Sequence, residues 1–253
     1  ASTLDSGIDE WSLKLTETHS ADISTRTFTG TKSIVNTTDS PFGEFWSLKG
    51  LSHLEISDDW ATVIFSHGGA SPYEREEGDP PPGGSGGTLE ENGDGSWTYN
   101  YRLGGTAEYD SSGVLQELVD RNENSTSFTY TSGLLTKITD ELDREITLSY
   151  TSGLLDEISG FAGEDTTFSH DGNDRLTSIT LPDPDGAGSQ TSPVTEFTYD
   201  STTGLMTEME DALDNTVSFD YDFAGRLEKK TFDDLTTNEY EPVIVQGLLD
   251  LSV

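Results

Sequence analysis

The chain has 253 residues, of which 48 are acidic and 13 basic, so its formal net charge is −35, and only 31% of its residues are hydrophobic. A surface this acidic repels phosphate backbones and anionic headgroups, which argues against nucleic-acid binding and against membrane docking. The absence of cysteine excludes disulfides, thiolate metal sites and cysteine nucleophiles, and no apolar run approaches the roughly 20 residues that a membrane-spanning helix needs.

Residues 1–96 are predicted to form an N-terminal β-module or cap. The segments 42–51 and 60–65 alternate aromatic, β-branched and small residues in the way that is typical of strands. Three prolines and a glycine-rich run then predict a flexible loop over 74–87. A module of this kind would cover the apolar face and the open strand edge of the first unit in a stacked array.

A repeat of about twenty residues occupies 97–240. Each unit has a turn residue followed two positions later by an apolar anchor, and the anchors recur at intervals of 20, 20, 21, 30 and 21 residues. The long interval contains a run of turn-forming residues, which predicts a loop insertion over 182–193. The anchors are Leu115, Leu135, Leu155, Leu176, Met206 and Leu227. Residues 241–253 are expected to be the start of a further repeat or a truncated tail.

Each unit is predicted to contain two short strands and two turns. Glycine at the first turn permits positive φ without steric cost, and the repeated positions are Gly113, Gly133, Gly153, Gly204 and Gly225. In the strands, a period of two places large side chains on one face: Phe128 with Tyr130, Leu148 with Tyr150, Phe197 with Tyr199, and Phe219 with Tyr221. Leu135 and Ile138 are three apart and so need a bulge or a strand end to share that face.

Three of these units carry a recognisable motif. Tyr109-Asp110, Tyr199-Asp200 and Tyr221-Asp222 each stand shortly before the turn glycine and the apolar anchor. This pattern resembles the YD-repeat of the RHS family. Other units depart from it, with Thr131 and Thr151 in place of the aspartate and His170 in place of the tyrosine. The resemblance implies an all-β fold, in which stacked two-stranded YD repeats form a spiralling β-sheet (an RHS-type shell or solenoid) with an N-terminal β-module.

The sequence shows no catalytic constellation. The four histidines have no metal-like spacing, and neither a nucleophile elbow nor a phosphate loop is present. The acidity fits a well-solvated surface, or carboxylates gathered around divalent cations. The one candidate metal site is Asp183 with Asp185, where alternating aspartates before a glycine could form a calcium-binding loop, although a plain turn is the simpler explanation because the remaining ligands of an EF-hand are missing. We expect no other cofactor and no enzymatic activity.

We therefore expect a structural scaffold, a YD-repeat wall of a bacterial extracellular or cell-surface protein, forming part of a filament or stalk. Its partners would be other copies of itself or further repeats of the same chain. One alternative is a fragment of an RHS shell that encloses a C-terminal toxin. Another is an adhesin that binds carbohydrate or surface glycans through loops 74–87 and 182–193.

Overall fold

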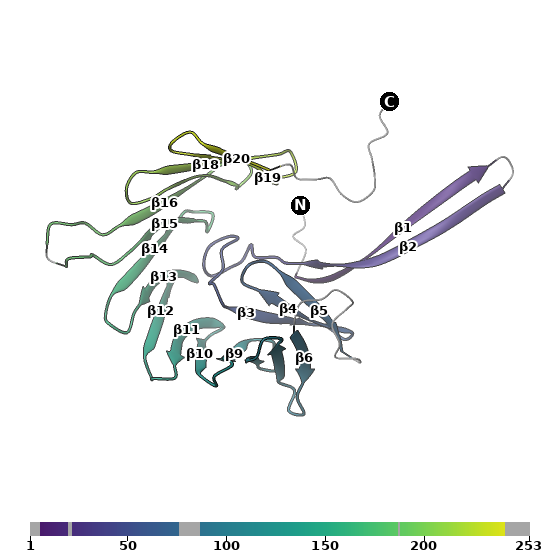
Figure 1. Cartoon of the computed structure of the whole chain (residues 1–253), viewed down its shortest axis with the longest axis horizontal. Coiled ribbons are helices and arrows are strands. Elements are labelled where there is room, and N and C mark those ends of the chain that lie inside the picture. The colour runs from purple at the N-terminus through teal and green to yellow at the C-terminus, as the bar shows by residue number, and fades with distance from the viewer. Residues whose placement is uncertain (1–5, 20–21, 76–86, 187, 241–253) are drawn as a thin grey trace. The chain divides into compact units, whose positions relative to one another are not determined.

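The computed structural model describes residues 6–19, 22–75, 87–186 and 188–240 (Figure 1). These residues form strands joined by turns and contain no helix, which confirms the all-β prediction. None of them belongs to a helix of the length and apolarity that crossing a bilayer requires. The residues divide into two compact units, 1–163 and 164–253, which are described separately below. The interior of the predicted loop 74–87 and the predicted tail 241–253 lie outside the described residues.

The first unit opens with two small sheets. A long hairpin pairs two strands, and a three-stranded antiparallel sheet follows it. The strands are β1 (Gly7–His19), β2 (Asp22–Ile34), β3 (Ser52–Ile56), β4 (Trp60–Phe65) and β5 (Ala70–Glu74). The predicted strand at 60–65 is β4. The predicted strand over 42–51 is wrong, because positive φ angles at Gly43, Phe45 and Gly50 break the extended backbone into turns.

The rest of the first unit is an antiparallel meander in which each strand pairs with the next one in sequence. Pairing begins at β6, ahead of residue 97, and the domain boundary at that residue stays a prediction. The strands are β6 (Gly87–Glu91), β7 (Trp97–Tyr101), β8 (Thr106–Tyr109), β9 (Leu115–Val119), β10 (Ser125–Thr131), β11 (Leu134–Asp140), β12 (Glu145–Thr151) and β13 (Leu154–Ser159).

The second unit continues the same pattern of consecutive antiparallel strands. Residues 181–193 contain no strand among those described, yet β15 and β16 on either side of them pair directly. The strands are β14 (Asp165–His170), β15 (Leu176–Thr180), β16 (Val194–Tyr199), β17 (Met206–Glu210), β18 (Thr216–Tyr221), β19 (Leu227–Phe232) and β20 (Thr237–Glu239).

A β-bulge recurs once in every unit of the repeat. Tyr130 pairs with Leu135 while Thr129 pairs with Lys137, so Thr136 is an extra residue on β11. The bulge is what places Leu135 and Ile138 on one face although they are three apart. The same shift occurs between β8 and β9, β12 and β13, β14 and β15, β16 and β17, and β18 and β19.

Two kinds of turn precede the bulges. At Tyr-Asp units the aspartate begins the turn, and Asp110 Oδ1 accepts the backbone N–H groups of Ser112 and Val114 at 2.9 and 3.0 Å. Where threonine replaces the aspartate, the strands are joined by two residues, Ser132-Gly133 in one case, both with positive φ. This is the type I′ geometry, which needs no side-chain cap.

The core of the first unit lies where the three-stranded sheet meets the start of the meander. Leu54, Val63 and Tyr73 from β3–β5 are buried, as are Tyr99 and Tyr109 from β7 and β8. The Leu54 N–H donates to the carbonyl oxygen of Gly113 at 2.8 Å. The N-terminal sheet therefore covers part of the repeat sheet within this unit. In the second unit the buried apolar residues are Leu176 and Phe197.

Candidate functional site

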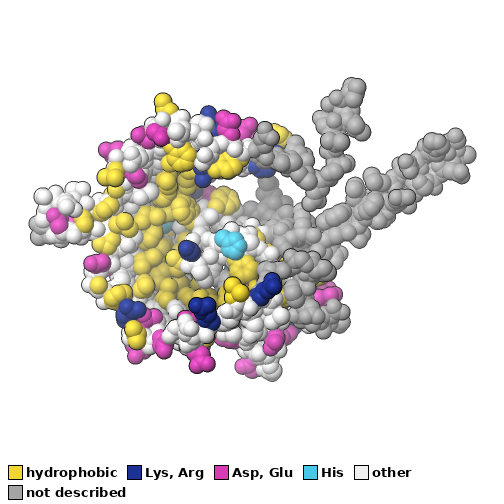
Figure 2. Space-filling model, viewed as in Figure 1, with side chains coloured by type: hydrophobic (Ala, Val, Ile, Leu, Met, Phe, Trp, Pro, Cys, Tyr) yellow, Lys and Arg dark blue, Asp and Glu magenta, His cyan; other side chains and the backbone are white. Residues whose placement is uncertain are grey.

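The apolar face of the repeat sheet gathers the predicted repeat positions. Eight of them are buried: Tyr109, Leu115, Phe128, Leu135, Leu148, Leu155, Leu176 and Phe197. Others are half-buried: Tyr130, Tyr150, Tyr199, Met206, Phe219, Tyr221 and Leu227. In the first unit, Figure 2 shows hydrophobic side chains gathered over β12 and β13, with acidic side chains at the turns. Each repeat thus leaves part of its apolar face open to solvent.

Tyrosine hydroxyls connect neighbouring strands on this face. Tyr150 on β12 donates to the carbonyl oxygen of Leu135 on β11 at 2.8 Å, and Tyr199 donates to that of Leu176 at 2.7 Å. Burial raises the pKa of Tyr150 to about 12, so its hydroxyl stays protonated and remains a donor. Tyr150 and Tyr199 therefore have a structural task, which is to join their strand to the anchor carbonyl of the preceding one.

The turn aspartates form a second repeated element. The side chain of Arg144 hydrogen-bonds to the Asp140 carboxylate and lowers the pKa of that group, assisted by backbone N–H donors. Arg226 acts in the same way on Asp222. These carboxylates are ionised and engaged, so they secure turns and are not available as general acids or bases.

The predicted calcium pair lies in the connection between β15 and β16. Asp183 Oδ1 accepts the N–H of Asp185, and Asp185 Oδ2 accepts the N–H groups of Ser189 and Gln190 at 3.0 and 3.2 Å. No group of three or more His, Asp or Glu side chains suited to a metal occurs in the part of the chain that the structure describes. Calcium binding by this pair stays a prediction.

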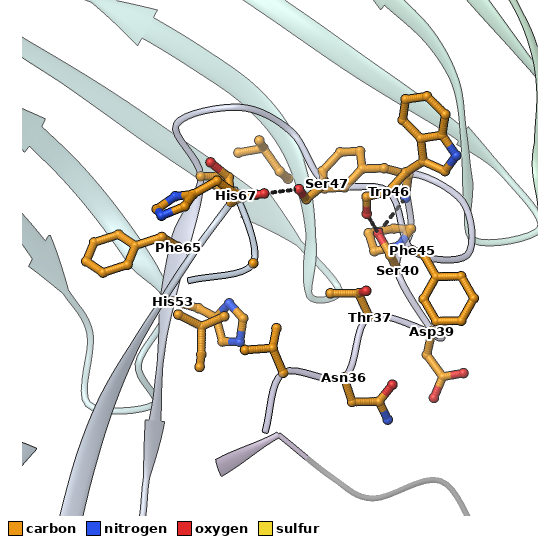
Figure 3. A pocket seen from close by; sticks show the side chains of 18 of the residues that line it. Asn36, Thr37, Asp39, Ser40, Phe45, Trp46, Ser47, His53, Phe65 and His67 are labelled. Carbon is orange, nitrogen blue, oxygen red and sulfur yellow. Dashed lines mark hydrogen bonds between the residues drawn. The ribbon is translucent and has the colours of Figure 1, made fainter. Parts of the chain in front are cut away.

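A cavity of about 620 Å³ lies in the first unit between residues 35–51, the strands β3 and β4, and the hairpin β10–β11. Figure 3 shows the rings of His53, Phe65 and His67 on one side of it, and the segment that carries Ser40 and Phe45 on the other. His67 stacks on Phe65 with ring centroids 5.5 Å apart. We call this the aromatic pocket.

Phe45 is the unusual residue of the aromatic pocket. Its φ of 65° lies in the left-handed region, which a bulky side chain rarely adopts, and its side chain is 61% exposed. Its N–H donates to the Thr37 carbonyl oxygen at 3.0 Å, which helps to hold this conformation. Strain of this kind concentrates where a side chain is held for binding.

The polar groups of the aromatic pocket suit binding better than catalysis. The Ser40 hydroxyl donates to the Trp46 carbonyl oxygen at 2.5 Å, and the Ser47 hydroxyl donates to that of Ser66. Neither hydroxyl is hydrogen-bonded to an imidazole, so neither is activated as a nucleophile. The sequence contained one signal for this pocket, the aromatic cluster within 42–51, but that cluster fits a strand equally well. His53 and His67 line the same pocket because β3 pairs with β4.

No family model and no curated protein matches the chain. The solved structures that resemble it in part include three of the Tc toxin. A crystal structure of TcdB2-TccC3 without its hypervariable C-terminal region is 13% identical, with a TM-score of 0.40, over 68% of this chain and 11% of that one. A TcdB2-TccC3-Cdc42 crystal structure is 14% identical, with a TM-score of 0.40, over 91% and 14%. A Photorhabdus luminescens Tc holotoxin pore, mutated at TccC3-D651A, is 13% identical, with a TM-score of 0.33, over 69% and 12%. This chain thus spans about a tenth to a seventh of the length of the chains it resembles.

Proposed function

We propose that the chain is a structural wall segment of a secreted or cell-surface assembly. The observation that carries the proposal is the bulge that recurs at each repeat, because it returns the anchor and the strand residues to the same face every twenty residues. A sheet in which the same strand register recurs can be extended by adding repeats. Its stability is approximately the sum of the stability of each repeat and of the contacts between neighbouring repeats.

The apolar face supports one form of wall over another. In the first unit Ile138, Ile146 and Tyr150 are half-buried, and in the second unit Phe168 and Met209 are as well. Such a face favours an enclosed space over open water, since exposed apolar area is costly. We therefore favour a shell whose lining is this face, and keep the filament or stalk as the alternative.

Electron micrographs of the native assembly that contains this chain separate the two forms. A shell predicts discrete hollow particles, whereas a stalk predicts long fibres of constant width. Soluble chains that form neither would contradict the structural proposal itself. The parent reading frame gives a second test, because a shell predicts an unrelated C-terminal domain as cargo.

The aromatic pocket favours glycan adhesion as a second candidate function. The exposed ring of Phe45 lines this pocket together with Asp39 and Asn36, and an apolar surface with polar neighbours is the combination that small-ligand sites use. Glycan-array binding that is lost in Phe45→Ala and kept in Phe161→Ala, an exposed ring elsewhere in the same unit, would support it. Equal binding by both variants would rule this pocket out.

A further inference from the structure

Alternate connections of an antiparallel meander lie on opposite edges of its sheet. In the second unit, one edge carries the described residues of the connections 181–186 with 188–193, 211–215 and 233–236, which follow β15, β17 and β19. We call these the Leu-Asp rim. The opposite edge carries the connections after β14, β16 and β18, which include Tyr-Asp turns.

Each connection of the Leu-Asp rim exposes one leucine. Leu181 is 48% exposed, Leu213 80% and Leu235 81%. The opposite edge has small polar side chains at its tips, such as Asn173 and Ser201, with the single large exception of Phe223. Exposed leucines thus recur at every connection along this edge, a regularity that scattered surface apolar residues do not have.

The connections that carry these leucines contain acidic residues but no basic ones. The connections of the Leu-Asp rim contain no lysine or arginine, and their carboxylates belong to Asp183, Asp185, Asp211, Asp214, Asp233 and Asp234. On the opposite edge, Arg175 and Arg226 neutralise Asp171 and Asp222. The Leu-Asp rim therefore combines apolar tips with uncompensated negative charge.

The turns that present Leu213 and Leu235 are internally fixed. Asp211 Oδ1 accepts the N–H of Leu213 at 2.8 Å, and Asp234 Oδ1 accepts the N–H of Thr236 at 2.9 Å. The carboxylates of Asp214 and Asp233 form no hydrogen bond or ion pair with any residue that the structure describes, and both residues are exposed. A partner would meet ordered leucines and free carboxylates, which keeps the entropic cost of binding low.

The spacing of the leucines suggests the form of the partner. Successive connections on one edge are two strands apart, which is about 10 Å. An α-helix repeats a side chain on the same face every seven residues, or about 10.5 Å. We propose that the Leu-Asp rim binds a cationic amphipathic helix of a partner protein, with apolar residues at every seventh position meeting the leucines and Lys or Arg meeting the aspartates.

A second copy of this chain fits the Leu-Asp rim poorly, because its net charge of −35 would repel that edge. The turns after β7, β11 and β13 in the first unit also expose apolar tips, at Leu103, Leu142 and Phe161. Those turns include arginines, one of which, Arg144, lies 5.0 Å over the Phe161 ring. Exposed leucines in connections whose charged residues are all acidic are thus a property of the second unit. The proposed helix binding does not depend on whether the chain is part of a shell.

A synthetic peptide tests the proposal. The probe is a fluorescein-labelled, alanine-based helix with leucine at every seventh position flanked by lysines, and its control is a scrambled peptide of the same composition. Binding to the full chain is measured by fluorescence anisotropy. We expect Leu213→Ser/Leu235→Ser to weaken binding about tenfold or more, and Asp214→Asn/Asp233→Asn to reduce its salt sensitivity.

The matched control is Phe223→Ser, which replaces the still more exposed apolar residue of the opposite edge and should bind within about twofold of the parent chain. All substituted residues lie at the surface, and unchanged unfolding transitions would show that each variant folds. Equal binding of the scrambled peptide, no binding of the helical one, or full binding by Leu213→Ser/Leu235→Ser would each overturn the proposal. So would self-association of the parent chain that the same double variant abolishes, since the occupant would then be a second copy.

Discussion

The hydroxyl of Tyr150 donates to the carbonyl oxygen of Leu135 on the preceding strand, 2.8 Å away, next to the bulge at Thr136. The same residue type therefore does two things in a repeat. Its ring contributes to the apolar face, and its hydroxyl satisfies a carbonyl where the bulge disturbs the ladder. Phenylalanine, which is equally apolar, could supply only the first.

Tyr150→Phe should consequently lower the free energy of unfolding by about 1 kcal/mol, because a partly buried hydrogen bond is lost while the ring is kept. Urea unfolding followed by circular dichroism measures the change. Tyr130→Phe is the matched control, since Tyr130 occupies the same repeat position but its hydroxyl bonds to no described residue. Equal effects of the two substitutions would show that the hydroxyl of Tyr150 is not what stabilises the fold.

Gly113 and Gly133 provide a second matched pair. Both have φ near 80°, but a Cβ at Gly113 would overlap the Leu54 carbonyl oxygen, whereas a Cβ at Gly133 would meet nothing within 4 Å. We expect Gly133→Ala to lower the free energy of unfolding by about 1 kcal/mol, because alanine is strained at a positive φ. Gly113→Ala should lower it by about 3 kcal/mol or more, because steric overlap is added to the same strain. Thermal unfolding compares them. Similar losses would mean that β3 does not lie against the repeat at this point.

Acid should weaken the turns. The pKa values of Asp140 and Asp222 are lowered, first by the side-chain hydrogen bonds from Arg144 and Arg226. A carboxyl group whose pKa is lower in the folded than in the unfolded protein stabilises the fold fully when the pH is above the unfolded value, here 3.8. That stabilisation is lost as the pH falls below this value. Melting temperatures measured from pH 7 to acid should thus fall below about pH 4. Asp140→Asn/Asp222→Asn should show a shallower fall, and an equally steep one would assign the effect to other carboxylates.

His170 offers a stabilising substitution. Its Nε2 atom is buried and has no hydrogen-bond partner among the described residues. Because an unpaired buried polar atom costs free energy, His170→Phe should raise the free energy of unfolding by about 1 kcal/mol. Denaturant unfolding provides the measurement. A decrease would indicate that the imidazole has a partner, such as bound water.

Much of the fold follows from spacing alone. The alternation at Phe128, Tyr130 and Leu148 predicts strands that share a face, and the structure has them in β10 and β12. The Leu135 and Ile138 spacing indicates an irregularity, but a bulge and a strand end look alike until the partner strand is known. Only the pairing of Tyr130 and Thr129 across the ladder distinguishes the two.

The features that the sequence could not reveal depend on contacts between distant segments. Residues 42–51 have the composition of a strand, yet Phe45 adopts a left-handed conformation that no local pattern predicts. The aromatic pocket requires β4 to bring Phe65 beside the segment that precedes β3. The Leu-Asp rim was missed because an exposed leucine in a turn, such as Leu213, cannot be told from a core residue before the strand edges are known.

The two-residue Ser-Gly hairpins have a consequence for how such chains can be found. Ser132-Gly133 and Ser152-Gly153 close their turns without any aspartate, and the bulge and register that follow match those after a Tyr-Asp turn. Two different turns thus lead into the same bulge and the same strand register. A search for the Tyr-Asp dipeptide alone would therefore miss these two repeats, whereas the interval of about twenty residues between the anchor leucines is present in both kinds.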